Sequence, residues 1–579
     1  MENYFKKILN MRMGMFVHYG IYSAFEGFYQ GKAAPHMGEW IQRNMRIPIA
    51  EYEKVGREKF CPKPDFAKNL VRKAKAAGMK YIVLTSKHHD GFCLFKTTVS
   101  DYSTYSFFGR DICKEVIDAC REEGLEVGLY YSHTLDWHEK DAAGNCYWSG
   151  IVANNRNSWD YPDDNIDFEK YLQEKCFPQV KEILTNYGPL KLIWFDFPHD
   201  ITKEQSSRLR DLVKSIQPEC QINSRIAHGL CDYYSLADNA LPVGPSGLAA
   251  ECLITLNNTW GYRRDDHNWK SIEDVVGILC RVLNSDATLL VNVGPMADGS
   301  LTPETEKLLS ELGEWTTRNE EAVYGDIKGN PFMAVFPWGY AATNNKSLYL
   351  YVTNPDTEHI VVPGMKDEIA FVSLLGVQED ITYELREQVL YITPSDTHMV
   401  VPVYKVEFKE VPEFERAITQ CGDELRLGMM WAGKVLKADI SAKPQKLVCE
   451  IDLYREDYGK HGLSVSGNGL ALFWNDPEEA LCWDAYFTKA GIYEVEVIHA
   501  LPTAEGRVTL VFDDMEHVVD MTQERGRFQV SKSGEENVRI CRDGGCIKVE
   551  KAGKYRILLI RDKGGDNLAI SEVRCRLKN

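Results

Sequence analysis

The chain has 579 residues, of which 44% are hydrophobic and 26% charged, an ordinary composition for a globular protein. Because this length exceeds what one hydrophobic core usually spans, we expect about two to four domains. The formal net charge of -18 disfavours a nucleic-acid partner, since an acidic surface repels phosphate backbones, but it does not disfavour neutral sugars.

Helical and strand periods alternate along the chain up to about Val323. The apolar runs that follow each helix are continuous, which is typical of strands buried on both faces of a parallel sheet. So many βα units over about 300 residues favour a closed barrel, and we expect a (β/α)8-like TIM barrel at residues 1–325. Helices are predicted at 64–78, 111–124, 165–188, 202–217, 271–284 and 302–319, and strands at 79–86, 125–132, 190–196, 220–225 and 287–295.

Beyond about Tyr324 the helical signal fades and short strands follow one another. Strand-like segments at 347–354, 369–375, 384–393 and 401–408 predict a small β-sandwich at residues 326–412. Segments at 446–454, 469–475, 490–501, 506–514 and 552–560 predict a second β-sandwich at residues 413–579. The paired phrases AGIYEVEV and AGKYRILL suggest a carbohydrate-binding module there, with a structural or oligomer-forming role as the alternative.

The C-terminal ends of the predicted barrel strands carry polar and aromatic side chains, and the active site of such a barrel lies at these ends. A buried polar group without a partner costs about 1–3 kcal/mol, so five such ends in a row are hard to explain by packing alone. We therefore expect a ligand-binding cleft. Its segments are His18-Tyr19-Gly20, Lys87-His88-His89-Asp90-Gly91, Tyr130-Tyr131-Ser132, Trp194-Phe195-Asp196 and Asn223-Ser224-Arg225, with Gly38-Glu39-Trp40 and Glu251 to Tyr262 beside them.

The mixture of residue types in these segments indicates a sugar site. Aromatic rings stack on apolar sugar faces, and His, Asn, Arg and Glu form hydrogen bonds with ring hydroxyls. A glycosidase adds two carboxyl groups across the scissile bond. Asp196 is the best candidate for a nucleophile, because it ends a strand and is flanked by aromatic residues. The alternative is a structural acid that caps the next helix.

A metal site is the competing explanation for the histidines. His88 and His89 are adjacent, so on a strand their side chains point to opposite faces, which makes them poor joint ligands. The sequence has no HExxH motif, and His133, Asp136 and His138 are a weaker candidate set. We expect no metal. The absence of a P-loop and of a Rossmann glycine motif after the first strand gives no reason to expect another cofactor.

Several segments together resemble glycoside hydrolase family 29, the α-L-fucosidases. The resemblance covers about Met13 to Gly325, and KHHDGF and LLVNVGPMADG are its most specific motifs. It implies a retaining exo-α-L-fucosidase that acts on fucosylated oligosaccharides or glycoconjugates by double displacement, with Asp196 as the nucleophile. The supporting segments are GMFVHYGIYS, GEWI, VGLYYSHTLDWH, LIWFDF and TWGYRRDD.

The resemblance also implies roles for further residues. Trp260 matches an aromatic residue that meets the methyl group of fucose, and the acid/base falls on a variable loop. Aligning Tyr234 with the family's tyrosine puts Asp238 in the place of the acid, and Glu251 is the second candidate. Phe197-Pro198-His199, where many relatives carry a small residue, can line the leaving-group subsite. The residues implied to hold sugar hydroxyls are His18, Glu39, Trp40, His88, His89, Tyr131, Trp194 and Arg225.

Two alternatives to this function stay open. One is the same barrel acting on a related sugar such as an α-L-galactoside, because a hydrophobic pocket rejects an added hydroxyl only modestly. The other is a catalytically inactive barrel that binds sugar, which would show saturable binding without turnover. An oligomer is compatible with either.

The N-terminal segment and the cysteines bear on the cellular compartment. The segment MENYFKKILNMRMGMFVHYG lacks the pattern of a signal peptide, and no stretch is apolar enough to span a membrane. The 16 cysteines include no CxxC pair and lie mostly in apolar runs, which is typical of reduced, buried cysteines. We therefore expect a cytoplasmic protein without a membrane partner.

Overall fold

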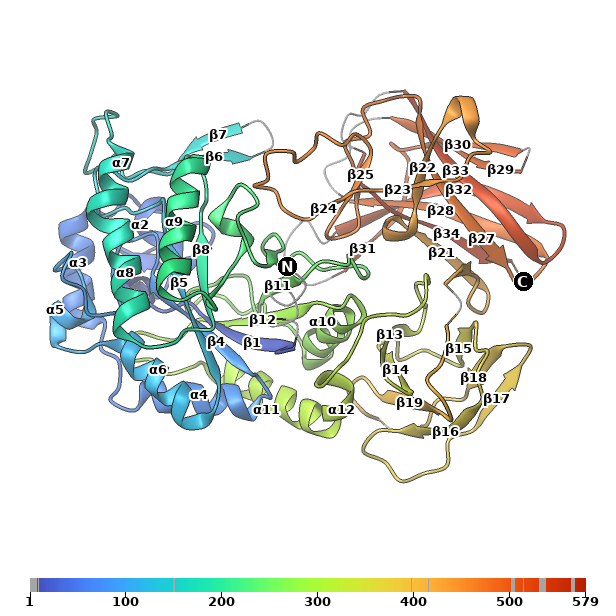
Figure 1. The fold of residues 1–579 in the computed structure, drawn as a ribbon, viewed down its shortest axis with the longest axis horizontal. Coiled ribbons are helices and arrows are strands. Elements are labelled where there is room, and N and C mark those ends of the chain that lie inside the picture. The colour runs from blue at the N-terminus through green and yellow to red at the C-terminus, as the bar shows by residue number, and fades with distance from the viewer. Residues whose placement is uncertain are drawn as a thin grey trace.

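A curled sheet of eight parallel strands forms the N-terminal half of the computed structural model (Figure 1), in the order β10-β11-β12-β1-β4-β5-β8-β9. The structure describes residues 8, 10–148, 151–396, 398–414, 416–500, 506–513, 515–530, 538–563 and 568–578. The strands are β1 (Met13–Val17), β4 (Tyr81–Lys87), β5 (Glu126–Ser132), β8 (Leu192–Asp196), β9 (Gln221–Ile222), β10 (Tyr234–Ser235), β11 (Ala250–Thr255) and β12 (Thr288–Val293).

The sheet closes through its two shortest strands, β9 and β10. A single parallel bridge joins Asn223 to Tyr233, and the Asp232 amide donates to the Ile222 carbonyl at 2.8 Å. β1, β4, β11 and β12 are buried along their whole length, which is why their sequences are continuous apolar runs. The predicted (β/α)8-like barrel is confirmed.

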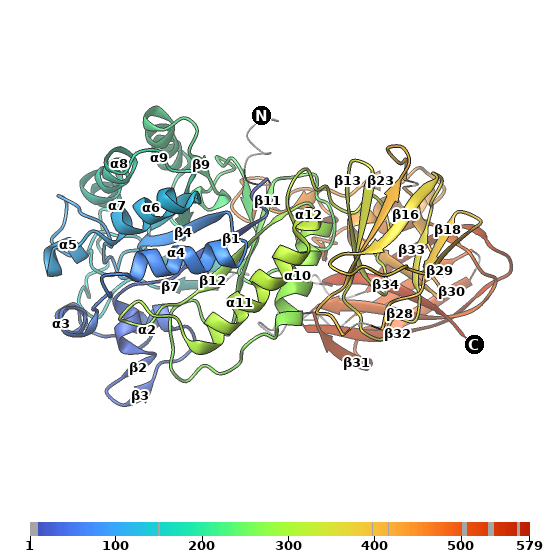
Figure 2. The same ribbon diagram turned by 90° about the horizontal axis from the view of Figure 1, so that it is seen from below.

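Four of the main helices of the barrel begin with a side-chain cap, at Asp111, Thr202, Ser271 and Thr302. The Asp111 side chain accepts from the Lys114 amide at 2.9 Å at the start of α6, and Gly124 ends that helix with a φ of 76°. Figure 2 shows α10 and α11 between the barrel strands and the first sandwich. These helices are α4 (Phe66–Ala76), α6 (Ile112–Glu123), α8 (Phe177–Asn186), α9 (Lys203–Ile216), α10 (Ile272–Asn284) and α11 (Pro303–Arg318).

Further helices complete the barrel region. The single helix predicted for 165–188 is divided into α7 (Phe168–Tyr171), one π turn at Leu172–Cys176, and α8. No helix among the described residues is long and apolar enough to cross a membrane. The remaining helices of this region are α2 (Ile41–Asn44), α3 (Ile49–Lys59), α5 (Thr104–Phe108) and α12 (Glu320–Val323).

The first sandwich packs two small antiparallel sheets against each other, in the orders β13-β14-β19-β16 and β15-β18-β17. The segment 384–393, predicted as one strand, belongs to a hairpin, because Glu387 and Gln388 have φ values of 49° and 65°, as a tight turn between two strands requires. Its strands are β13 (Gly339–Asn344), β14 (Ser347–Val352), β15 (Ile360–Pro363), β16 (Ile369–Leu374), β17 (Tyr383–Arg386), β18 (Val389–Ile392) and β19 (Val403–Phe408).

The second sandwich has the larger sheets, of seven and five strands, around a buried core that includes Trp483 and Phe487. The predicted class, a barrel followed by two β-sandwiches, is confirmed, while the domain boundaries after residues 325 and 412 stay predictions. Residues 501 and 514, predicted strand ends, lie outside the described residues. The long strands are β21 (Glu424–Gly428), β22 (Gly433–Leu436), β27 (Glu479–Phe487), β28 (Gly491–Ala500), β29 (Arg507–Phe512), β30 (Met515–Asp520), β31 (Glu524–Gln529), β32 (Val538–Val549), β33 (Gly553–Lys563) and β34 (Ile570–Leu577).

Two segments of the second sandwich are not the core strands that their apolar runs predict. Residues 446–454 contribute the short strand β24 (Cys449–Glu450), and residues 469–475 contribute β26 (Ala471–Leu472). Both belong to a separate small sheet with β25 (Ser464–Ser466). Figure 1 shows β24 and β25, in orange, on the side of the red sandwich that faces the barrel.

Candidate active site

A cavity of about 510 Å³ lies at the C-terminal ends of the barrel strands, within the range of about 300–1,000 Å³ that is typical of ligand pockets. His18 follows β1, His88 follows β4, and Asp196 ends β8, so several strands meet there. The predicted site residues that line the cavity are His18, Glu39, Trp40, His88, His89, Trp194, Asp196, Arg225, Asp238 and Trp260.

Asp196, the candidate nucleophile, is held in place by two donors. Its Oδ2 atom accepts from the Tyr130 hydroxyl at 2.8 Å, and its Oδ1 atom accepts from Arg225 Nη1 at 2.9 Å. Burial alone would raise the pKa of Asp196, but the Arg225 charge and the two hydrogen bonds outweigh it, and the pKa lies below its ordinary value. The carboxylate is therefore ionised at neutral pH.

Arg225 joins the two candidate carboxyl groups. Its Nη2 atom donates to Asp238 Oδ1 at 2.5 Å, while its Nη1 atom binds Asp196. The guanidinium lies over the Trp194 ring, with its central carbon 4.8 Å from the ring centroid. The Asp238 side chain is 47% exposed and that of Asp196 only 15%, so one carboxylate lies deep in the cavity and the other nearer the solvent.

Three of the four histidines that line the cavity, His18, His88 and His89, are uncharged. Burial lowers the pKa of His18 to about 4 and the pKa values of His88 and His89 well below their ordinary range. The Nδ1 atom of His18 lies 2.7 Å from Asn292 Oδ1, and that of His89 lies 2.7 Å from Ser132 Oγ. Fixed neutral imidazoles of this kind can form hydrogen bonds with uncharged hydroxyl groups.

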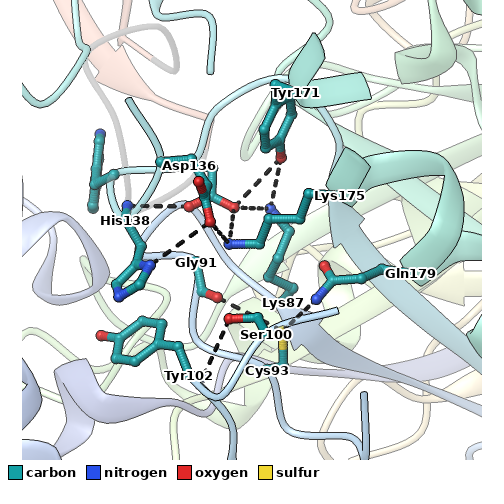
Figure 3. Close-up of polar contacts among 12 residues, drawn as sticks. Lys87, Gly91, Cys93, Ser100, Tyr102, Asp136, His138, Tyr171, Lys175 and Gln179 are labelled. Atoms are coloured by element: carbon teal, nitrogen blue, oxygen red, sulfur yellow. Dashed lines mark hydrogen bonds and ion pairs between the residues drawn. The ribbon is translucent and has the colours of Figure 1, made fainter. Parts of the chain in front are cut away.

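A buried charged cluster, with Asp136 at its centre, lies beside the histidine loop, residues 87–91, which carries His88 and His89 (Figure 3). Asp136 Oδ2 lies 2.9 Å from Lys87 Nζ and 3.0 Å from Lys175 Nζ, and the Tyr171 hydroxyl accepts from Lys87 at 3.1 Å. The next residue along, Trp137, donates its amide to the His89 carbonyl at 2.7 Å. The cluster therefore supports the loop that carries the histidines. The Asp136 carboxylate, part of the weaker metal set, is engaged by two lysines.

Two buried polar atoms of the cavity have no hydrogen-bond partner among the described residues, Glu39 Oε1 and His88 Nδ1. The other oxygen of Glu39 accepts from the Gly261 amide at 2.8 Å. Burial raises the pKa of Glu39 to about 7. Because an unpaired buried polar atom costs about 1–3 kcal/mol, this wall of the cavity suits a ligand that carries hydroxyl groups.

An apolar wall adjoins these polar atoms. The Trp260 side chain is buried, with its ring centroid 5.2 Å from that of His18 and 6.1 Å from that of Phe16. Trp40 packs edge to face on Trp137, with 5.4 Å between the ring centroids. Polar and apolar walls in one cavity match a ligand that has hydroxyl groups on one side and an apolar group on the other.

The structure does not bring Tyr131 and Glu251 into the cavity. Side chains alternate along β5, so Tyr130 faces the barrel interior while Tyr131 faces the helices and donates to Gln179 at 2.8 Å. Tyr130 therefore takes the place predicted for Tyr131.

Glu251 is fully buried beneath the cavity floor and accepts from the Trp194 indole at 2.8 Å and the Tyr81 hydroxyl at 2.9 Å. These bonds leave Asp238 as the candidate acid that reaches the cavity.

The residues after Asp196 line the cavity as well. Phe197 has a φ of 58°, in the left-handed region that favours small residues, and both Phe197 and His199 border the cavity. A further part of the lining comes from residues 450–472 of the second sandwich and was not predicted from the sequence. Its aliphatic residues lie in the segments 446–454 and 469–475, for which sandwich strands were predicted. No motif distinguished a cavity lining from a sandwich strand.

The fold and the site together define a glycoside hydrolase. A barrel with two carboxyl groups, neutral histidines and aromatic rings in one cavity at its strand ends has the groups that cleavage of a glycosidic bond requires.

Comparison with known proteins identifies the family. The α-L-fucosidase family model matches residues 2–321. Plasma α-L-fucosidase of Homo sapiens is 28% identical over 337 residues, which cover 54% of this chain and 68% of the relative. The chain belongs to the α-L-fucosidase family.

Solved structures agree with this assignment. The structure of α-L-fucosidase AlfC from Lactobacillus casei in complex with its α-L-fucose product is 36% identical, with a TM-score of 0.52, over 55% of this chain and 99% of that one. The α-L-fucosidase from Vibrio sp. strain EJY3 is 23% identical and shares the fold, with a TM-score of 0.81 over 100% of this chain and 98% of that one.

Proposed function

We propose that this protein is a retaining exo-α-L-fucosidase, which removes terminal α-L-fucosyl residues from oligosaccharides or glycoconjugates. The observation that carries the proposal is the pair of carboxyl groups, Asp196 and Asp238, which line one cavity and bind the same guanidinium. Relatives named α-L-fucosidases support it, and so does the fucose bound to AlfC.

In the proposed reaction, the Asp196 carboxylate attacks the anomeric carbon and forms a covalent fucosyl-enzyme intermediate. The low pKa of Asp196 keeps the attacking oxygens deprotonated, and the bonds from Tyr130 and Arg225 fix their orientation. The neutral histidines and Glu39 accept or donate hydrogen bonds to the sugar hydroxyls. Trp260 provides an apolar surface for the C5 methyl group.

Asp238 acts as the acid and then as the base. It protonates the oxygen of the leaving group and later removes a proton from the water that hydrolyses the intermediate. Because Asp238 is ion-paired with Arg225, the proposal requires the carboxyl group to leave Arg225 and take up a proton when the substrate enters. Its position nearer the solvent suits a group that must reach the leaving oxygen and water.

The first test is hydrolysis of 4-nitrophenyl α-L-fucoside by the wild type and by Asp196→Ala. We expect release by the wild type and a loss of roughly a thousandfold or more in kcat/KM for the variant. Asp118→Ala, on the exposed face of α6, is the matched control and should retain activity. Saturable fucose binding without release by the wild type would favour the inactive sugar-binding alternative.

The acid is tested by azide rescue. Asp238→Ala should lose activity on substrates with poor leaving groups, whose departure needs the acid. On 4-nitrophenyl α-L-fucoside, whose leaving group departs without protonation, azide should restore turnover of the variant, because azide can attack the intermediate without a general base. The product should be the α-fucosyl azide, since azide enters from the face that the leaving group has left. Rescue of Glu251→Ala with no effect of azide on Asp238→Ala would contradict the assignment.

A further inference from the structure

Part of the cavity wall belongs to the C-terminal sandwich, far from the barrel in sequence. The wall comes from the small sheet β24-β25-β26 and the loop within it. Leu453 is 39% exposed, whereas His18, His88 and Trp194 on the barrel side are almost fully buried. The barrel residues therefore form the closed end of the cavity, and the sandwich residues form its mouth.

The wall is fixed on the barrel at several points. The His228 amide donates to the Tyr454 carbonyl at 2.8 Å, and Lys203 forms an ion pair with Glu456 at 3.1 Å. Gly467 approaches Leu236 so closely that an added Cβ atom would lie 2.7 Å from its Cδ2 atom. The segment has a defined place beside the barrel loop at 236–249, which contains Asp238.

This placement puts the wall next to the atoms where the bond would break. Leu236 and Asp238 belong to one loop, and both line the cavity beside Gly467. The Tyr454 ring packs edge to face on His199, with 5.8 Å between the centroids. An acid at Asp238 protonates the oxygen that joins fucose to the leaving group, so the leaving group must extend toward this wall.

The chemistry of the wall suits an uncharged sugar. The Tyr454 and Tyr458 rings and the side chain of Leu453 offer apolar surface to a ring face. Asn468 accepts from the Ser466 hydroxyl, and its amide nitrogen has no partner among the described residues. Glu450 and Asp238 make this end acidic, which disfavours an anionic ligand.

We propose that residues 450–472 form the subsite for the leaving-group sugar, a neutral pyranose ring that stacks on the tyrosines and forms a hydrogen bond with Asn468. This inference rests on the proposed function, because it takes the cleaved bond to lie between Asp196 and the wall. A cavity of about 510 Å³ accommodates ligands larger than one fucose.

The test compares two substrates that share fucose and differ in the leaving group. α-L-Fucosyl fluoride has no leaving-group sugar, whereas a fucosyl disaccharide has one. We would measure kcat/KM for the fluoride and for the best of a panel of disaccharides, with the wild type, Tyr458→Ala and Asn468→Ala. Tyr486→Ala is the matched control, because Tyr486 lies in the same sandwich, is 44% exposed and is not part of the cavity lining.

We expect the ratio of the disaccharide value to the fluoride value to fall about tenfold in each subsite variant, as for the loss of one good contact. The control should keep the wild-type ratio within about twofold. Unchanged thermal midpoints will show that the variants are folded. An unchanged ratio in both subsite variants would overturn the inference.

The remaining outcomes separate this inference from the proposed function. A wild type that cleaves the fluoride but no disaccharide would overturn the subsite alone. A wild type that cleaves neither substrate would contradict the proposed function, and the subsite with it.

Discussion

Glu39 and Glu251 are two buried carboxyl groups with the same pKa shift and different surroundings. Burial raises the pKa of each to about 7. Glu251 accepts hydrogen bonds from Trp194 and Tyr81, whereas one oxygen of Glu39 lacks a partner among the described residues. We infer that Glu251 supports the Trp194 ring from below and that Glu39 meets the ligand.

The pH dependence of stability tests the state of Glu39. Its folded pKa of about 7 lies above the ordinary value of 4.5, so the folded form holds a proton that the unfolded form releases between these values. The stabilisation is present below about pH 4.5 and is lost as the pH rises through about 7. Glu39→Gln removes this pH-dependent contribution to the free energy of unfolding. The contribution of Glu251 is the same in the wild type and in the variant.

We therefore expect the unfolding free energy of the wild type, relative to Glu39→Gln, to fall by about 3 kcal/mol between about pH 4.5 and pH 8. Denaturant titrations at several pH values measure this difference. A difference that stays constant across the range would show that the Glu39 pKa is not raised.

The position of Tyr131 shows where sequence reasoning failed at the scale of one residue. The motif VGLYYSHTLDWH located the strand end correctly, but it contains two adjacent tyrosines. Successive side chains of a strand point to opposite faces, so only one of the two tyrosines can face the barrel interior. The pairing of Tyr130 with Trp194 on the neighbouring strand fixes which one does. That register requires the pairing of strands distant in sequence, which a single sequence does not reveal.

The loop after β4 is the element on which the histidines depend. Its support is Asp136, whose carboxylate is fully buried between Lys87 and Lys175. Breaking a buried pair by removing one charge leaves the other charges uncompensated, which costs about 3–5 kcal/mol. The loop should therefore be sensitive to changes that are far from any sugar contact.

Asp136→Asn tests this dependence with almost no change in volume. We expect a loss of about 3–5 kcal/mol in unfolding free energy, because Lys87 is left buried without a carboxylate, while Lys175 keeps its ion pair with Glu139 at 2.9 Å. Asp118→Asn is the matched control, since its pair with Lys114 is exposed and should be worth about 0.5 kcal/mol or less. Equal stability losses in the two variants would contradict the supporting role of the cluster.

At the level of elements, the main barrel helices and most barrel strands were predictable, because their periodicity and helix-end residues are strong local signals. The helix α3 (Ile49–Lys59) was not predicted. The segments 446–454 and 469–475 were not. Leu453, Leu470 and Leu472 are apolar because they line a cavity, and the same pattern arises in a core strand. Only their placement against the barrel distinguishes the two cases, and that placement is a long-range property.

The molecule as a whole builds one site from two regions of the chain. Residues 450–472 complete a cavity whose other lining residues lie between Phe16 and Trp260 in the sequence, so the second β-sandwich contributes to the candidate active site. Figure 1 shows this part of the chain between the red sheets and the barrel. Ligand binding should therefore affect both regions.

Hydrogen exchange can measure this coupling in the inactive Asp196→Ala variant. A bound fucosyl disaccharide should slow amide exchange in peptides that cover the histidine loop at 87–91 and also in those that cover 450–472, because the ligand stabilises the folded form that binds it. Peptides from the distant sheet β15-β18-β17 serve as the internal control. Protection confined to the barrel peptides would contradict the shared site.

The most direct test of the account is to trap the covalent intermediate with 2-deoxy-2-fluoro-α-L-fucosyl fluoride, which forms the ester readily and hydrolyses slowly. Mass spectrometry of a peptide digest then locates the sugar. The account predicts one fluorofucosyl group on the peptide that contains Asp196, and none after the Asp196→Ala substitution. A label on another residue, or turnover of the reagent without any ester at Asp196, would contradict the proposed retaining mechanism.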